Sequence, residues 1–257
     1  MTTISRRAFV ASGLAATAAA CTPAEPELIG GIPADQIVEG YGFIEDGDYE
    51  LPPVPPEYLK WPNRRQLIYY EGEEAPGIIE VDPHAKFLYW ILDDGTAWRY
   101  PIAVGRASVG LRGTTVVRDK RKWPSWTPTA NMLRREPEVY GPFAGGVPGG
   151  LASPLGARAL YLYRGNRDTY YRIHGTNDLK SIGNSGSAGC IRLFNHDIID
   201  LYERVPIPTT VKIRTYEDSV RLLGEEMANR GVELPPTIVD PETIYGAAGA
   251  EEGVGET

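Results

Sequence analysis

Two short segments, Tyr171-Arg-Ile-His-Gly-Thr176 and Ser187-Ala-Gly-Cys-Ile-Arg-Leu193, are joined by a loop rich in Gly, Ser and Asn. The first alternates apolar and polar residues, which predicts a strand that delivers His174 at its end. A cysteine held beside a histidine is the minimum set for thiol catalysis, because the imidazole takes the thiol proton and later protonates a leaving amine. Gly189 permits a sharp turn and leaves the amides of Gly189 and Cys190 free to stabilise an oxyanion.

The neighbours of Cys190 favour a nucleophile over the commoner use of a lone cysteine as a small buried residue. Ser187, Gly189 and Arg192 make a polar turn around it, unlike a core strand. Ser187 either donates to this turn or caps it. Arg192 either holds a substrate carboxylate, for which its guanidinium is suited, or forms a salt bridge that braces the turn.

His174 is the predicted acid/base partner, with a core histidine and a metal ligand as alternatives. His84, expected in a turn, and His196, expected exposed in the first turn of a helix, show no metal-ligand spacing with it, so we predict no metal. No Asp or Glu is placed by sequence to orient His174. A backbone carbonyl, or the hydroxyl of Thr176 or Ser187, is the alternative.

Composition limits the classes of partner. The chain has 257 residues, 42% of them hydrophobic, enough for one good-sized core. Its net charge of -8 and pI of about 5.1 argue against nucleic acid and anionic lipid surfaces. No stretch is long and apolar enough to span a bilayer, so any membrane contact is expected through an N-terminal anchor.

Residues 1–20 resemble an export signal of the twin-arginine kind, with Arg6-Arg7 ahead of the small apolar run from Ala11 to Ala20. Cys21 then stands where a lipoprotein is lipidated; ordinary cleavage that leaves Cys21 unmodified is the alternative. A disulfide between Cys21 and Cys190, the two cysteines of the chain, is a further possibility. The protein is therefore expected in the periplasm or cell wall.

Residues 21–66 are rich in Pro, Glu and Gly and predict a tether, with an arm packed on the domain through Tyr41, Phe43, Tyr58 and Trp61 as the alternative. A catalytic domain is predicted over 67–215. Residues 216–257 are expected to form a helix followed by an acidic, disordered tail.

Within the predicted domain the fold class is mainly β, a sandwich or barrel with few helices. One helix is expected after the cysteine, capped by Asn195 and stopped by Pro206, and a second from Asp218 to Arg230. The strands are expected at 67–70, 77–81, 86–92, 96–104, 159–163, 169–174 and 211–215.

A long insertion, residues 105–156, separates the two β halves. Trp123 and Trp126 lie among prolines within it. We predict a lid whose tryptophans contact substrate, with a structural flap covering the barrel as the alternative.

The motifs Ile173-His-Gly-Thr-Asn177 and Ser187-Ala-Gly-Cys-Ile-Arg-Leu193 resemble those of the L,D-transpeptidases, the YkuD-type catalytic domain, in their proteobacterial branch. The resemblance implies that Cys190 is the acyl-forming nucleophile, His174 its acid/base partner and Gly189 part of the oxyanion hole. It also implies substrate contacts by Gly175 and Thr176. Ala188 departs from the pattern, since many members have histidine there.

The function implied by this resemblance is attack on a peptidoglycan tetrapeptide stem, release of D-alanine, and transfer of the acyl group to an amine without a cofactor. The amine belongs to another stem, giving a 3-3 crosslink, or to an outer-membrane protein or lipoprotein. If water accepts the group, the protein is an L,D-carboxypeptidase. A catalytically weak peptidoglycan-binding lipoprotein and an unrelated Cys-His amidase are the alternatives.

Overall fold

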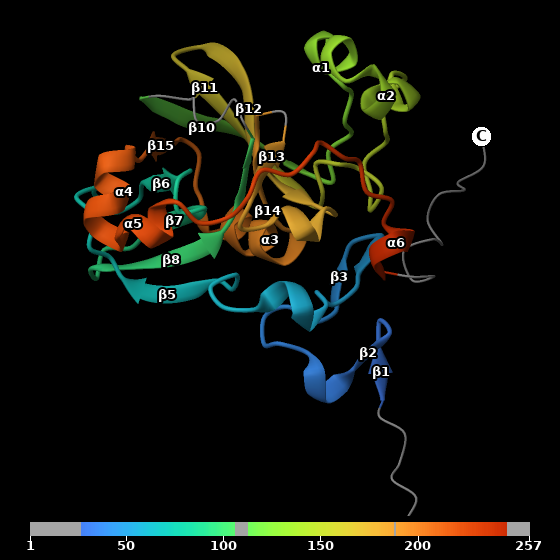
Figure 1. The fold of residues 1–257 in the computed structure, drawn as a ribbon, viewed down its shortest axis with the longest axis horizontal. Helices are drawn as coiled ribbons and strands as arrows, with labels where there is room; N and C mark the ends of the chain where they lie inside the picture. The colour runs from blue at the N-terminus through green and yellow to red at the C-terminus, as the bar shows by residue number, and fades with distance from the viewer. Residues whose placement is uncertain (1–26, 106–112, 188, 246–257) are drawn as a thin grey trace, which may run out of the picture.

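A computed structural model describes residues 27–105, 113–187 and 189–245 (Figure 1). The predictions for the export signal, Cys21, Ala188 and the tail beyond residue 245 lie outside the described residues, as does the side chain of Ser187. Within the described residues, strands outweigh helices and most of them join one mixed sheet, so the prediction of a mainly β fold is confirmed.

The large sheet has eleven strands in the described residues. In sheet order these are β13 (Ser185–Ser187), β9 (Ala103–Gly105), β14 (Ile191–Phe194), β12 (Arg167–Thr176), β11 (Arg158–Arg164), β10 (Thr114–Lys122), β15 (Thr209–Ile213), β6 (Ile79–Asp82), β7 (Phe87–Ile91), β8 (Thr96–Pro101) and β5 (Gln66–Tyr69). Most neighbours are antiparallel, whereas β12 pairs with β14, β15 with β6, and β13 with β9 in parallel.

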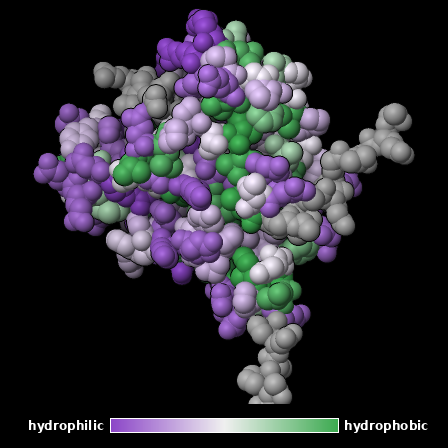
Figure 2. Space-filling view, turned by 45° about the vertical axis from the view of Figure 1, so that its right-hand side comes forward, coloured by the Kyte–Doolittle hydropathy of each residue, from purple (hydrophilic) through white to green (hydrophobic). Residues whose placement is uncertain are grey.

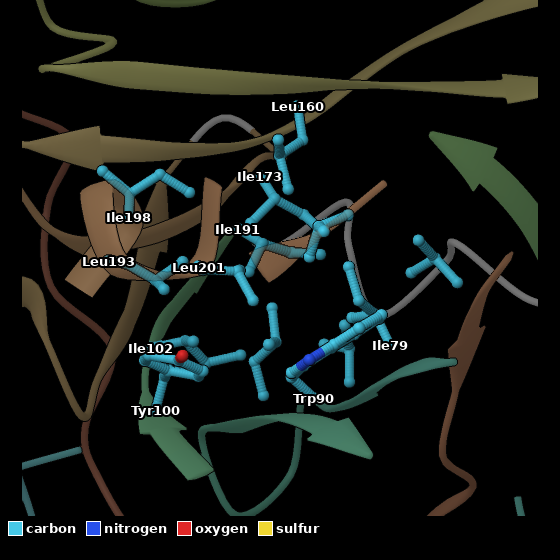
Figure 3. Close-up of a cluster of buried hydrophobic side chains, with 14 of the residues drawn as sticks. Ile79, Trp90, Tyr100, Ile102, Leu160, Ile173, Ile191, Leu193, Ile198 and Leu201 are labelled. Carbon is cyan, nitrogen blue, oxygen red and sulfur yellow. The ribbon is translucent and has the colours of Figure 1, made fainter. Parts of the chain in front are cut away.

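The sheet closes over one main apolar core, and two smaller apolar clusters lie beside it. Ile79 of β6 and Trp90 of β7 share this core with Ile173 of β12 and Leu193 of β14, although the two pairs of strands lie in opposite halves of the sheet (Figure 3). Distant strands can share one core only if the sheet bends back on itself. The fold is therefore sandwich-like, as the spacing of the strands predicts.

Strand β10 is the one long strand that the sequence did not predict. It pairs with β11 on one side and β15 on the other, at the centre of the sheet. Its second half, Arg118-Asp-Lys-Arg-Lys122, is charged and gives no apolar alternation. Two of its cations lie over aromatic rings instead: Lys120 Nζ is 4.1 Å from the ring centre of Tyr202, and the Arg121 guanidinium is 4.6 Å from that of Tyr161. Lys120 Nζ also donates to the carbonyls of Tyr202 and Val205, so the charged half of the strand is packed although it is not apolar.

The helices are short and lie around the sheet. They are α1 (Ala130–Arg135), α2 (Pro137–Tyr140), α3 (Asn195–Arg204), α4 (Tyr216–Leu223), α5 (Glu225–Ala228) and α6 (Glu242–Tyr245), with 3-10 turns η1 (Ala34–Gln36), η2 (Pro56–Leu59), η4 (Gly141–Phe143) and η5 (Leu179–Ser181). Through the described ranges, none of them combines the length and the apolar composition that crossing a bilayer requires.

Three predictions about the helices need correction. The expected helix 218–230 is interrupted at Gly224, whose φ of 82° lies outside helical space, so α4 and α5 are separate. Asn195 is the first residue of α3 and does not cap it; its Oδ1 accepts a hydrogen bond from Ala157 N at 2.9 Å. His196 is buried rather than exposed, because the N-terminal part of the chain around Gly42 covers it. The Gly42 carbonyl lies 2.6 Å from its Nε2.

Residues 27–66, which we name the N-terminal arm, pack on the domain from Tyr41 onward. The arm holds two small hairpins, β1 (Leu28–Ile29) with β2 (Ile32–Pro33), and β3 (Ile44–Asp46) with β4 (Tyr49–Leu51). Tyr41, Val54 and Leu59 are buried with Phe194 at the end of β14. These aromatic and aliphatic residues of the arm therefore cover an apolar surface at the end of β14.

Polar and apolar residues are unevenly distributed over the molecular surface. Figure 2 shows hydrophobic residues gathered in a broken band down the middle of one face, with hydrophilic residues on both sides. Exposed large apolar side chains are found on the arm at Leu28, Phe43 and Trp61.

A buried ion pair fastens the arm to the sheet. Arg158 of β11 is 1% exposed, and its Nη1 and Nη2 donate to Asp46 of β3 at 2.6 and 2.7 Å. The indole of Trp123 donates to the same carboxylate at 2.7 Å. Asp46 thus neutralises the charge of a buried guanidinium. The hydrogen bonds from Arg158, and with them the one from Trp123, hold the pKa of Asp46 below its usual value.

We expect Asp46→Ala to lower the free energy of unfolding by about 3 kcal/mol, because it leaves the buried Arg158 charge uncompensated. Chemical denaturation of the full chain measures this. Asp48→Ala, at an exposed position of the same hairpin, is the matched control and should change stability little. Equal stability of the two variants would contradict a structural role for the pair.

Candidate active site

The register of two neighbouring strands brings the predicted catalytic residues together. In the parallel pair of β12 and β14, His174 lies opposite Arg192 and Ile173 opposite Ile191. One step back, the same register sets Cys190 opposite Arg172. Since side chains alternate between faces, Arg172, His174, Cys190 and Arg192 project from the same side of the sheet.

The other face of these strands anchors the pair in the core. Ile173, Ile191 and Leu193 are fully buried and point toward Ile198 and Leu201 of α3 (Figure 3). A slip of one residue in either strand would turn its apolar residues outward. The hydrophobic core therefore fixes the positions of His174 and Cys190.

A cavity of about 490 Å³ lies over this polar face, and Cys190 and His174 are both among its lining residues. Three other segments complete its walls: the insertion (Trp126, Met132), the hairpin of β11 and β12 (Tyr161, Tyr170) and the chain near the C-terminus, residues 236–239. Its volume lies within the range of small-molecule sites, so it accommodates a short peptide segment.

His174 is buried and electrically neutral. Its Nδ1 lies 2.6 Å from the Gly175 carbonyl, which can only accept, so this contact favours the tautomer with the proton on Nδ1 and a lone pair on Nε2. Burial lowers the pKa of His174 to about 3, with a further lowering by the charges of Arg192 and Arg172. A backbone carbonyl thus orients the ring, one of the alternatives that the sequence left open.

Cys190 is partly exposed and follows a turn that requires glycine. The φ of Gly189 is 145°, a backbone conformation that residues with a Cβ rarely adopt. Burial raises the pKa of the Cys190 thiol, while a hydrogen bond from the Arg172 backbone and the charges of Arg172 and Arg192 oppose that rise. With the histidine pKa lowered and the cysteine pKa raised, the resting pair is thiol and imidazole, not thiolate and imidazolium.

Arg192 forms the predicted salt bridge and still faces the cavity. Its Nη1 donates to Asp178 Oδ2 at 3.1 Å. Its Nε is buried without an acceptor among the described residues. Both roles predicted for Arg192, bracing of the turn and binding of a carboxylate, are therefore compatible with its contacts.

Gly175 and Thr176, which follow His174 on β12, have different surroundings. A Cβ at Gly175 would overlap Asn195 Oδ1, so this glycine lets the start of α3 approach β12. Asn195 in turn donates to Asn177 Oδ1 at 3.2 Å. Thr176 lines the cavity, and its hydroxyl accepts from Asp178 N at 3.0 Å.

The two tryptophans of the insertion have different surroundings. Trp126 lines the cavity and lies near Tyr140, with 6.2 Å between ring centres. Trp123, predicted to bind substrate, is absent from the cavity walls of the described residues. Its ring packs against that of Tyr49, with 4.4 Å between ring centres and an angle of 40° between the planes, and its indole N–H donates to Asp46. Both partners belong to the N-terminal arm.

Arg172 is the site residue that sequence reasoning missed. It forms a bidentate pair with Asp168, at 2.7 and 2.8 Å, and its guanidinium lies 4.1 Å from the ring centre of Tyr161. Its position two residues before His174 was a usable signal, since residues two apart on a strand share a face. Through the described residues, no group of His, Cys, Asp or Glu is arranged to hold a metal.

Comparison with known proteins identifies the family. The model of the YkuD L,D-transpeptidase catalytic domain matches residues 76–213, more than half of the chain. The chain therefore belongs to the L,D-transpeptidase family, a family of cysteine-dependent acyltransferases, and the resemblance inferred from its motifs is confirmed.

Several individual proteins are similar to it. "Probable L,D-transpeptidase YbiS" of Escherichia coli K12 is 34% identical over 160 residues, 62% of this chain and 50% of that protein. "Probable L,D-transpeptidase YcfS" of the same strain is 40% identical over 168 residues, 63% and 51% of the two chains. This chain thus spans about half the length of these relatives.

Among solved structures, one from Brucella melitensis named as a probable carnitine operon oxidoreductase is 45% identical, covering 59% of this chain and 94% of that one, with a TM-score of 0.41. An L,D-transpeptidase from Mycobacterium smegmatis is 16% identical over 54% of this chain and 58% of that one, with a TM-score of 0.38.

The neutral state of His174 predicts acid lability. Its ordinary pKa of 6.5 applies in the unfolded chain and a pKa of about 3 in the folded one, so between these values the unfolded chain binds more protons. Stability should therefore fall as pH falls through this window, by up to about 1.4 kcal/mol per pH unit from this group. Chemical denaturation at several pH values between 7 and 4 measures this. The free energy of unfolding of His174→Gln should fall less steeply with falling pH than that of wild type, and an unchanged slope would contradict burial of the neutral ring.

The raised pKa of Cys190 predicts slow alkylation near neutral pH. We expect its rate with iodoacetamide, followed by peptide mass spectrometry, to keep rising above pH 9, because the thiolate is the reacting species. Arg172→Met should slow the reaction at pH 8 several-fold by removing a nearby positive charge. Arg167→Met, at the exposed start of the same strand, is the control, and equal rates in both variants would argue against this electrostatic effect.

Proposed function

We propose that the protein is an L,D-transpeptidase that acts on peptidoglycan stem peptides through a Cys190 acyl-enzyme. The observation that carries this proposal is the register of β12 and β14, which sets a partly exposed cysteine beside a buried, neutral histidine in one cavity. Membership of the family supports the substrate class.

In the first half-reaction, the Cys190 sulfur attacks the carbonyl between the third, diamino-acid residue of the stem and its terminal D-alanine. The thiol proton passes to the lone pair of His174, and the Gly189 and Cys190 amides stabilise the oxyanion. The C–N bond then breaks, and the same proton leaves with the D-alanine amine. Because the resting pair is neutral, charge develops on the two residues only as the bond forms.

In the second half-reaction an amine attacks the thioester, His174 takes its proton, and the Cys190 sulfur leaves and regains a proton. An amine from another stem gives a 3-3 crosslink, one from an outer-membrane protein or lipoprotein anchors that protein, and water gives a carboxypeptidase. Arg192, with its unsatisfied Nε, would hold a carboxylate of the stem.

We also propose that the protein is exported and held at the membrane or cell wall. Support comes from the twin-arginine-like residues 1–20, from Cys21 at the lipoprotein position, and from the extracellular location of the family's substrate.

A second candidate is a peptidoglycan-binding protein with little catalysis. The observation that favours it is Ala188, where many family members have histidine. Such a protein would bind the stem in the same cavity without forming an adduct.

Intact-protein mass spectrometry with a purified disaccharide-tetrapeptide tests the proposal. We expect an adduct equal to the stem minus D-alanine, together with free D-alanine. Cys190→Ala and His174→Ala should lower D-alanine release by about a thousandfold or more, because each removes a member of the reacting pair. His84→Ala, a half-buried histidine in a turn away from the cavity, is the matched control.

Normal release by either site variant would overturn the mechanism. Binding of the stem without adduct or release by wild type would favour the binding protein. Analysis of the products distinguishes crosslinked dimer from tripeptide and so assigns the acceptor.

A further inference from the structure

The chain beyond α5 crosses the candidate active site. Figure 1 shows this segment, in red, running from α5 past β13 to α6. We name residues 231–239 the C-terminal strap. It lies outside residues 76–213, the range matched by the family domain.

The strap is fastened to the loop that precedes Cys190. Ser185 N donates to the Val232 carbonyl at 2.9 Å, and Leu234 N donates to the Ser185 carbonyl at 2.7 Å. The strap thereby covers β13, an edge strand of the large sheet.

The loop is shaped to receive this segment. A Cβ at Gly186, whose φ is 145°, would overlap the Leu234 carbonyl. The Asn184 side chain accepts a hydrogen bond from Val232 N at 2.9 Å. Three consecutive residues of the Gly/Ser/Asn-rich loop between His174 and Cys190, Asn184 to Gly186, therefore contact the strap.

The chain is also held on the far side of the cavity. Ile244 of α6 packs against the apolar cluster that contains Tyr41 and Phe194, where the N-terminal arm meets β14. Between these two attachments, Pro236, Ile238 and Val239 line the cavity together with Cys190 and His174. The strap is thus a wall of the site, held directly at Val232 and Leu234 and, beyond its other end, through Ile244 of α6.

Its chemistry differs from that of the sheet surface below it. Arg172 and Arg192 line the cavity as cations from the strands, whereas three of the four lining residues of the strap, Pro236, Ile238 and Val239, are apolar and the fourth is Thr237. Pro236 also has no backbone N–H. The cavity thus has charged groups for carboxylates on the sheet and an apolar surface on the strap. A peptide that carries carboxylates and methyl-bearing residues is complementary to both.

We propose that Ile238, with Pro236 and Val239, forms an apolar binding subsite for the stem peptide and so determines affinity for the peptide donor. This inference rests on the proposed function for the identity of the ligand. The subsite acts in binding, and the reacting pair remains Cys190 and His174.

Equilibrium binding tests the subsite separately from turnover. Titration calorimetry of the tetrapeptide into full-length Cys190→Ala, with and without Ile238→Asn, measures affinity where no reaction occurs. We expect the second change to weaken binding about tenfold, since it replaces an aliphatic contact with a polar group. Val232→Asn is the matched control: its side chain is 62% exposed on the same strap and lies outside the cavity walls, so binding should be unchanged.

Steady-state release of D-alanine by Ile238→Asn with Cys190 intact should show a raised KM and a kcat within about twofold of wild type. Unchanged affinity in the calorimetry would overturn the subsite. Faster release or tighter binding would also overturn it, because the strap would then be an obstruction. If wild type releases no D-alanine while Ile238→Asn still weakens binding, the proposed function fails and the subsite stands.

Discussion

The parallel register of β12 and β14 is the constraint on which the site depends. Ile173, Ile191 and Leu193 bury one face of these strands, and their burial fixes what the other face presents. No polar interaction has to bring Cys190 to His174, because the hydrophobic core has already done so. The carbonyl of Gly175 then orients the His174 ring, and the turn at Gly189 positions the Cys190 thiol.

Burial of the pair also sets its protonation state. Desolvation disfavours both charged forms, the imidazolium and the thiolate. At Cys190 it raises the thiol pKa while the neighbouring arginines lower it, whereas at His174 desolvation and the arginines both lower the pKa. A neutral cysteine is a weaker nucleophile toward small reagents in solution. A thiol that is protonated at rest is less open to oxidation and other side reactions, because the thiolate is the reacting species.

Much of the domain was predictable from the sequence because its strands alternate or form short apolar runs bounded by turns. The hairpin of β11 and β12 that carries His174, and the helix after Cys190, follow from such local patterns, although β12 continues two residues beyond the predicted end at His174. Strand β10 was not predictable in this way, since its charged half packs by placing cations over Tyr161 and Tyr202. Trp123 and His196 were misplaced for a related reason: their surroundings come from the N-terminal arm, and contacts between residues so far apart in sequence leave no local signal.

The attachments of the arm and the strap have a consequence for the minimal folding unit. A fragment cut to the range of the family domain would lose Asp46, exposing the guanidinium of Arg158 and the ring of Trp123. It would also lose the strand-like partner of Ser185 and one wall of the cavity. The segments that complete the fold and the cavity walls therefore extend beyond residues 76–213 at both ends, and Ile244 packs against the apolar cluster that contains Tyr41.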